Sequence, residues 1–291
     1  LAPISAGGGV WGGHRRGNLG GHQGREKPLK KILVTALIGC CFFVQATVAQ
    51  ETPKHLQLAR EFVLNTKQAN NSYSNSKVYT RMPGDLFASE YVVSTDCSGF
   101  VEDMFRRTGG GVLAQLTTQK LKNRHSILDF HASIERQEAF QKIVKVEDIQ
   151  PGDVAAWRYI NMADHQLPGH ILFVDSAPVK IKPRKPIIDG LDQYEFTLID
   201  TSQEAKSRDD TRYVSDAGLR DANESKGKER GTISSPNYKG VGRGHMRFYA
   251  DSEGNIRGAA FSFSSAKFHP NGGDWDIVVG RPRLTADGER R

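Results

Sequence analysis

Two Pro-Gly turns, each running directly into an apolar segment, constrain the fold of this chain more than any other feature. The turn "PGD" (151–153) leads into an apolar run from Val154, and Pro168-Gly169 leads into "HILFV" (170–174). Short apolar runs bounded by turn residues are typical of buried β-strands. Together with a third run, "YEFTLIDTS" (194–202), they predict neighbouring strands of an antiparallel sheet.

Helical patterns precede these strands. In "HLQLAREFVLN" (55–65) the apolar residues fall on one helical stripe, which predicts an amphipathic helix. Asp96 stands where the N-cap of a second helix belongs, and "RRTGGG" (106–111) ends that helix with basic residues and glycines. Two final strands are expected at 242–251 and 256–265. The chain is therefore predicted to be an α+β protein, with N-terminal helices packed on a mostly antiparallel sheet.

The start of the chain differs from the rest. A basic stretch (25–31), an apolar stretch (32–44) and a small-residue stretch (45–50) follow one another. This order is the pattern of a secretory signal, and the apolar stretch is too short to span a bilayer. We therefore expect a leader over residues 1–49 with the signal at about 25–49, and a domain over 50–291. The domain would be secreted or periplasmic, without a stable membrane span.

The leader also allows a lipid anchor as a less favoured alternative. "LIGC" (37–40) fits a lipoprotein cleavage box that would leave Cys40 as a lipid-bearing N-terminus. The residues that follow Cys40 are apolar, unlike the polar tether usual after a lipidated cysteine. Cleavage after Ala49 is therefore preferred.

Charge argues against a nucleic-acid ligand. Six of the 40 Lys and Arg and one of the 33 Asp and Glu lie in residues 1–49, which leaves 34 basic and 32 acidic residues after the leader. The high isoelectric point thus reflects the leader, and no basic helix follows it. We expect no nucleic-acid binding.

Cys97 is the only cysteine that remains after cleavage at Ala49, so it has no partner for an intrachain disulfide. An unpaired thiol in an oxidising compartment is exposed to damage unless it is buried or functional. Cys97 directly follows the expected cap Asp96, where helix N–H groups favour a thiolate, and small Ser98 and Gly99 leave room for a substrate. Cys97 is thus a candidate nucleophile with a lowered pKa. A buried structural cysteine is the alternative.

A cysteine nucleophile needs a base, which is commonly a histidine. His170 stands at the first position of an apolar strand, at the rim of the predicted sheet, and His245 in "GRGH" is the next candidate. If strands 170–176 and 194–200 form an antiparallel hairpin, Asp200 lies opposite His170 and can orient its ring. A register slip of two residues would place Ser202 there instead.

Three motifs, "DCSGFV" (96–101), "PGDVAAW" (151–157) and "GHILFV" (169–174), resemble in sequence and order the NlpC-type cell-wall cysteine peptidases, a papain-like group of bacterial hydrolases. The resemblance covers about residues 55–205. It implies a papain-like fold, with Cys97 as the nucleophile and His170 as the base. The implied substrate is an amide bond in the peptide stems of peptidoglycan.

The chain departs from the family pattern in three places. The third catalytic residue of the family, commonly a histidine, would fall near Asp200 to Ser202, where no histidine stands. The aromatic-Gly-Gly stretch usual before the cysteine is absent. The polar segment 202–240 is not part of the minimal family domain, and its composition predicts a long, mobile insertion.

The sequence thus predicts a monomeric, exported cysteine hydrolase that cleaves amide bonds through an acyl-enzyme on Cys97. His170 and Asp200 would assist, and this chemistry needs no metal or other cofactor. One alternative is an amidase or acyltransferase with the same fold and another substrate. The other is a non-catalytic cell-wall-binding protein that retains Cys97.

Overall fold

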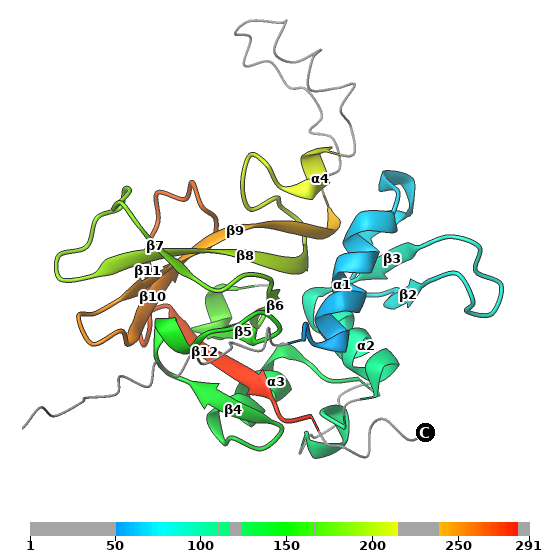
Figure 1. Ribbon diagram of the computed structural model, residues 1–291, viewed down its shortest axis with the longest axis horizontal. Coiled ribbons are helices and arrows are strands. Elements are labelled where there is room, and N and C mark those ends of the chain that lie inside the picture. The colour runs from blue at the N-terminus through cyan, green and yellow to red at the C-terminus, as the bar shows by residue number, and fades with distance from the viewer. Residues whose placement is uncertain (1–50, 110, 117–123, 166, 215–238, 285–291) are drawn as a thin grey trace, which may run out of the picture. The chain divides into compact units, whose positions relative to one another are not determined.

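The computed structural model describes residues 51–109, 111–116, 124–165, 167–214 and 239–284, so the predicted leader lies outside the described residues (Figure 1). The described residues belong to one compact unit, 50–291. Its helices are α1 (Lys54–Asn65), α2 (Cys97–Thr108), α3 (Ile127–Glu135) and α4 (Thr211–Val214). Short 3₁₀ turns are η1 (Gln68–Asn70), η2 (Leu113–Gln115), η3 (Val146–Asp148) and η4 (Met162–Asp164).

The strands form two sheets. Their bounds are β1 (Asn71–Tyr73), β2 (Tyr79–Arg81), β3 (Val92–Thr95), β4 (Phe140–Ile143), β5 (Val154–Tyr159), β6 (Gly169–Val174), β7 (Val179–Ile181), β8 (Asp192–Ser202), β9 (Gly240–Ala250), β10 (Ile256–Ala260), β11 (His269–Pro270) and β12 (Trp275–Pro282). The small sheet has the order β1-β3-β2, and the large sheet has the order β11-β10-β9-β8-β6-β5-β12-β4, with β7 beside β8.

The predicted α+β class is confirmed. Each pairing in the large sheet is antiparallel. In the small sheet β1 runs parallel to β3. Helices α1 and α2 lie against each other beside the small sheet, and α2 also packs on β6 (Figure 1).

The end of the chain was predicted wrongly. Two strands were expected to close the fold, but β11 and β12 follow them, and β12 lies between β5 and β4. The partners of β12 are more than a hundred residues away in sequence, so no local sequence pattern predicts this pairing.

Two hydrophobic cores cover the two faces of the large sheet. The first fills the space between the helices and one face, with Phe62, Phe100, Phe105 and Phe173 among its members. The second covers the other face and contains Trp157, Leu172, Phe196, Phe248 and Trp275.

The sheet curls until its two ends meet. The Val146 N–H donates to the Gly254 carbonyl over 2.9 Å, and the Ile256 N–H donates to Val144 over 3.2 Å. These bonds join the end of β4 to the start of β10, and the curl encloses the second core.

The ends of α2 agree with the prediction. The Asp96 side chain accepts a hydrogen bond from the Gly99 N–H at 2.7 Å, as an N-cap does. Gly109 ends the helix in the left-handed region with φ 73°. Gly99 has no substitute here, because a Cβ on it would collide with the Thr95 hydroxyl and Val78. These features fix the first turn of α2 tightly.

The prediction that residues 202–240 form a long, mobile insertion is partly wrong. Its first part is packed into the fold, with Lys206, Asp210 and Arg212 each at most 1 % exposed. Residues 215–238 lie outside the described residues. Among the described residues, no helix is long and apolar enough to cross a membrane.

His55 links α1 to the turn before β5 and gives a prediction for stability. The ring is 1 % exposed and its Nε2 donates to the Gly152 carbonyl over 2.8 Å. Burial lowers the pKa of His55 from 6.5 to about 4. Because the folded pKa lies below the unfolded one, stability is full above pH 6.5 and falls as pH drops toward 4, by about 3 kcal/mol. Urea unfolding at pH 4.5, 5.5 and 7 measures this loss.

The matched variant is His55→Phe, which keeps a ring against Phe105 and Phe173. It is expected to be less stable at pH 7, because the Gly152 carbonyl loses its donor, and to depend less on pH below 6.5. Burial also lowers the pKa of His269 to about 4, so a smaller dependence remains. An unchanged slope in His55→Phe would contradict the assignment.

Candidate active site

Helix α2, which begins at Cys97, packs against β6, in which His170 is the second residue. Cys97 is the first residue of α2 and is 5 % exposed. The backbone N–H groups of Ile171 and Ser98 donate to its sulfur. The thiol is therefore held next to the backbone of His170, at the N-terminus of a helix.

His170 is fixed by a carboxylate. Its Nε2 lies 2.7 Å from Asp200 Oδ2, and the Asp200 side chain is fully buried. The ring also packs against Trp157, with centroids 5.0 Å apart, and against Phe261 at 5.5 Å. Because Nε2 donates to the carboxylate, Nδ1 is the ring nitrogen that is able to accept a proton from the thiol.

The His170–Asp200 contact is present, but the register that led to it was wrong by two residues. The strand pairs are Phe173 with Ile199 and Val174 with Leu198, so His170 would extrapolate to Ser202. The ladder between β6 and β8 ends at Phe173, and the carboxylate reaches the ring diagonally. Ser202 instead accepts a hydrogen bond from Lys206 Nζ at 2.8 Å.

A cluster of buried charges behind Asp200 was missed from the sequence. Arg212 donates to Asp200 Oδ1 and, over 3.1 Å, to the Asp200 carbonyl. Lys206 Nζ lies 3.7 Å from Asp200 Oδ2, and Arg212 also pairs with Asp210 at 3.2 Å. All these side chains are fully buried.

The one sequence signal for this cluster is a row of alternate glycines on β9. A Cβ on Gly242 would collide with Arg212, and a Cβ on Gly244 would collide with Asp210 and stand 2.9 Å from Lys206 Cβ. Asp200 is the strand partner of Gly242. The glycines thus leave the space on this face of the sheet that the charged side chains occupy.

The predicted lowering of the Cys97 pKa is not supported. Burial raises the pKa of Cys97 to about 12, and the charges of Asp96 and Asp200 add to the increase. The N–H groups of Ile171 and Ser98 oppose it without overcoming it. The argument from the helix N-terminus omitted the burial of the sulfur and the charge of the cap itself.

The pKa values of His170 and Asp200 are shifted in directions that keep the ring of His170 neutral and Asp200 ionised. Burial lowers the pKa of His170, against the hydrogen bond to Asp200, and the charges of Lys206 and Arg212 lower it further. Burial alone would raise the pKa of Asp200, but Arg212 and Lys206 outweigh burial and hold it well below its usual range. The resting site therefore holds a neutral thiol, a neutral imidazole and an ionised Asp200.

This state predicts slow alkylation of Cys97. The rate with iodoacetamide at pH 6–7 should be lower in the folded protein than in urea, because the reactive thiolate is scarce when the pKa is about 12. The rate should keep rising to pH 10 without a plateau. Measuring second-order rates from pH 6 to 10 tests this, and a plateau below pH 8 would show an ionised thiol instead.

A cavity of about 260 Å³ opens beside the ring of His170. Its lining is Tyr73, Tyr159, Leu167, Gly169, His170, Ser202, Gln203, Glu204 and Phe261. A Cβ on Gly169 would collide with the Trp157 carbonyl, so glycine is required where the chain enters β6. The cavity thus reaches His170, whereas Cys97 is not among its lining residues.

Tyr73 is a further site residue that the sequence reasoning missed. It belongs to β1 and pairs with Thr95, two residues before Cys97. Burial raises the pKa of Tyr73, and the nearby Cys97 and Asp96 raise it further. Its hydroxyl therefore stays protonated and remains a hydrogen-bond donor.

His245, the second candidate base, is engaged elsewhere. Its Nδ1 lies 2.7 Å from Glu195 and its Nε2 lies 3.3 Å from Asp209. It is not among the residues that line the cavity beside His170. The structure thus places Cys97 against the backbone of β6 next to His170, joins His170 to Asp200, and leaves His245 outside.

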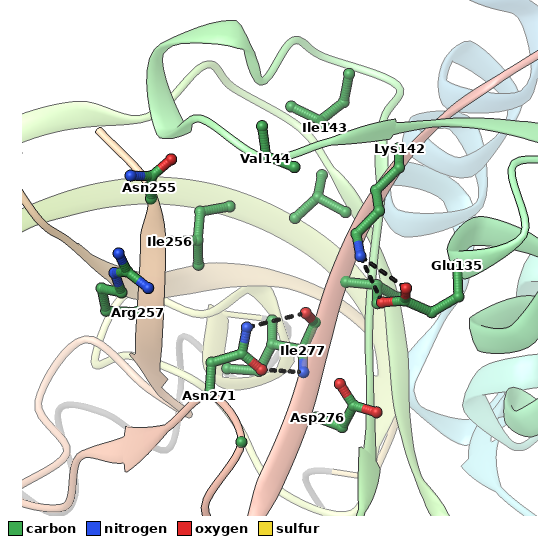
Figure 2. A pocket seen from close by; sticks show the side chains of 13 residues that line it. Glu135, Lys142, Ile143, Val144, Asn255, Ile256, Arg257, Asn271, Asp276 and Ile277 are labelled. Atoms are coloured by element: carbon green, nitrogen blue, oxygen red, sulfur yellow. Dashed lines mark hydrogen bonds and ion pairs between the residues drawn. The ribbon is translucent and has the colours of Figure 1, made fainter. Parts of the chain in front are cut away.

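A second group of polar side chains lies near another cavity, of about 540 Å³, where the two ends of the large sheet meet (Figure 2). His131, Glu135 and Asp276 place potential metal ligands within 4.8 Å of one another. Lys142 donates to both oxygens of Glu135 at 2.7 Å, and Arg158 donates to Asp276 at 2.8 Å. Because two cations already neutralise the carboxylates, this group is an ion-pair network rather than a metal site.

Comparisons with known proteins give little functional information. The chain matches no protein-family profile, and no solved structure matches it. It is similar to Uncharacterized protein R653 of Acanthamoeba polyphaga mimivirus, at 26 % identity over 198 residues, which are 66 % of this chain and 78 % of the viral protein.

Proposed function

We propose that the protein is an exported, papain-like cysteine hydrolase that cleaves amide bonds in the peptide stems of peptidoglycan. The observation that carries the proposal is the hydrogen bond of 2.7 Å between His170 Nε2 and Asp200 Oδ2, next to a buried thiol at a helix N-terminus. The resemblance of the three motifs to NlpC-type peptidases supports the choice of substrate and the secreted or periplasmic location.

The proposed reaction starts from the neutral pair. Nδ1 of His170 takes the proton of Cys97 as the sulfur attacks the carbonyl carbon of the amide. The developing oxyanion is stabilised by donors at the start of α2 and by the Tyr73 hydroxyl. The imidazolium then gives its proton to the leaving amine, and a thioester with Cys97 remains.

The second half-reaction uses the same groups. His170 takes a proton from a water that attacks the thioester carbonyl, and returns it to the sulfur as the carboxylic acid leaves. Asp200 keeps the ring in the tautomer that carries its proton on Nε2. If a second amine replaced water, the same site would act as an acyltransferase.

The test is incubation of the purified protein with purified peptidoglycan, followed by mass spectrometry of the released fragments. Cleavage at a stem amide by the wild type and not by Cys97→Ala supports the proposal. Sedimentation with peptidoglycan without any release would favour a wall-binding protein. A transferred stem with no new carboxylic acid would favour the acyltransferase.

A further inference from the structure

More charged side chains are buried behind Asp200 than the orientation of the His170 ring requires. Arg212 already holds Asp200, by donating to Oδ1 of its carboxylate and to its backbone carbonyl. Lys206 adds a second buried cation, with its Nζ 3.7 Å from Asp200 Oδ2. A buried ammonium is costly unless it is paired, so its place needs a reason.

We propose that Lys206 is a positioning residue that acts through Asp200: its ammonium sets the proton affinity of His170, and with it the pH range in which His170 is able to take the proton of Cys97. The inference rests on the proposed function for its catalytic meaning. It states that the charge of Lys206 changes the pKa of His170, although the two side chains do not touch.

Three contacts hold the ammonium in place. Nζ donates to Ser202 Oγ over 2.8 Å and lies 3.7 Å from the oxygen of Asp200 that bonds His170. It also lies 3.2 Å from the centroid of the Phe261 ring, as in a cation–π contact. The same ring packs against His170 at 83°. One carboxylate oxygen and one aromatic ring therefore separate the ammonium from the imidazole.

The charge of the cluster explains the coupling. Burial lowers the pKa of Lys206 to about 8, so its ammonium is present below that pH. There Asp200 and Asp210 carry two negative charges, and Lys206 and Arg212 carry two positive ones, so the cluster is neutral while His170 is neutral. A proton on His170 leaves one uncompensated charge in a buried site. Removing the ammonium of Lys206 would leave one negative charge, which a protonated His170 would balance.

The other titratable groups around the His170 ring do not balance a proton on the ring in this way. The charged or titratable groups that face His170 or line its cavity are Asp200, Lys206, Arg212, Cys97, Tyr73, Tyr159 and Glu204. Cys97, Tyr73 and Tyr159 are neutral below pH 9, because burial raises the pKa of each. Glu204 lies at the open side of the cavity. Lys206 is thus the buried charge whose removal most directly changes the balance at Asp200.

The experiment is a histidine titration by NMR, with Lys206→Met as the variant and Lys180→Met as the matched control. Lys180 also pairs with an aspartate of β8, Asp192 at 2.7 Å, but it is exposed. The signal of His170 is assigned from its loss in His170→Gln. We expect the His170 pKa to rise in Lys206→Met and to stay unchanged in Lys180→Met. An unchanged pKa in a folded Lys206→Met overturns the proposal.

Activity gives the second readout. The acid limb of kcat/KM for stem cleavage should move to higher pH in Lys206→Met, by the same amount as the NMR pKa. A uniform loss at every pH, without a shift, would assign Lys206 a structural role and overturn the proposal. Because the titration needs no substrate, a shifted His170 pKa in a protein that cleaves no peptidoglycan would uphold the coupling and refute the proposed function.

A second variant covers the case in which Lys206→Met does not fold. Lys206→Gln also removes the ammonium next to Asp200, and it keeps a polar group that is able to donate to Ser202 Oγ. This variant should therefore also show a raised His170 pKa, and an unshifted titration there would overturn the proposal equally.

Discussion

Replacing His170 with alanine is expected to lower stem cleavage by about 10³-fold or more, because the base is lost from a site whose thiol does not ionise by itself. With a Cys97 pKa of about 12, very little thiolate exists at pH 7. The reaction therefore depends on a base that removes the proton during attack. Initial rates of fragment release measure the effect, and circular dichroism with thermal melting checks that the variant is folded.

His245→Ala is the matched control. His245 pairs with Glu195 and Asp209, outside the cavity. Its loss should leave cleavage nearly unchanged. If His245→Ala were inactive and His170→Ala were active, the choice of His170 as the base would be wrong.

The buried, neutral thiol also bears on the survival of Cys97 in the oxidising compartment that the proposed export implies. Oxidation and disulfide exchange proceed through an exposed thiolate. Cys97 is 5 % exposed and its pKa is raised, so both routes are slowed. The same burial that removes spontaneous reactivity makes the nucleophile dependent on His170.

Parts of the site were predictable because their determinants are local. Asp96 caps α2 through a hydrogen bond to a residue three positions along the chain. Gly169 enters β6 directly before His170. In both cases a few adjacent residues define the conformation, so a short motif is sufficient to place Cys97 and His170 at element ends. The strands β5, β6, β8 and β9 were also predicted, and β5 and β6 are marked by apolar runs that directly follow Pro-Gly turns.

The pairing of strands was harder to predict than the strands themselves. A symmetric hairpin would pair His170 with Asp200, whereas the observed register pairs Phe173 with Ile199. The intervening β7 also pairs with β8, in a register that differs again. Such irregularities depend on tertiary packing. The contact was still found because side chains on neighbouring strands also reach diagonal positions.

The charged cluster could not be predicted from composition. Segments rich in charge are usually solvated, and this expectation led to the assignment of 202–240 as mobile. Lys206 and Arg212 are buried because Asp200 and Asp210 compensate their charge and because Gly242 and Gly244 leave space for them. Asp200 lies on β8 and the two glycines lie on β9, so both conditions depend on residues outside the charged segment around Lys206 and Arg212. Tyr73 was missed for a similar reason, since its place depends on the pairing of β1 with β3.

Asp200→Asn is expected to lower cleavage by about 10²- to 10⁴-fold by changing the tautomer of His170. Arg212 donates to Oδ1 of Asp200, so the amide introduced by this substitution would turn its oxygen to Arg212 and its NH₂ group to His170. Nε2 would then have to accept, and the neutral ring would carry its proton on Nδ1. That nitrogen could no longer take the proton of Cys97.

Asp200→Ala tests a different property, because it leaves Arg212 and Lys206 as buried cations without their shared partner. We expect a loss of stability of about 3–5 kcal/mol, in addition to inactivity.

Ser202→Ala removes one acceptor from Lys206 and should cost about 1 kcal/mol, with only a modest loss of activity. Urea unfolding and kcat/KM from pH 5 to 9 separate these effects, and ¹⁵N chemical shifts report the tautomer of His170. Full activity in Asp200→Asn, together with an inactive Ser202→Ala, would assign the orienting role to Ser202.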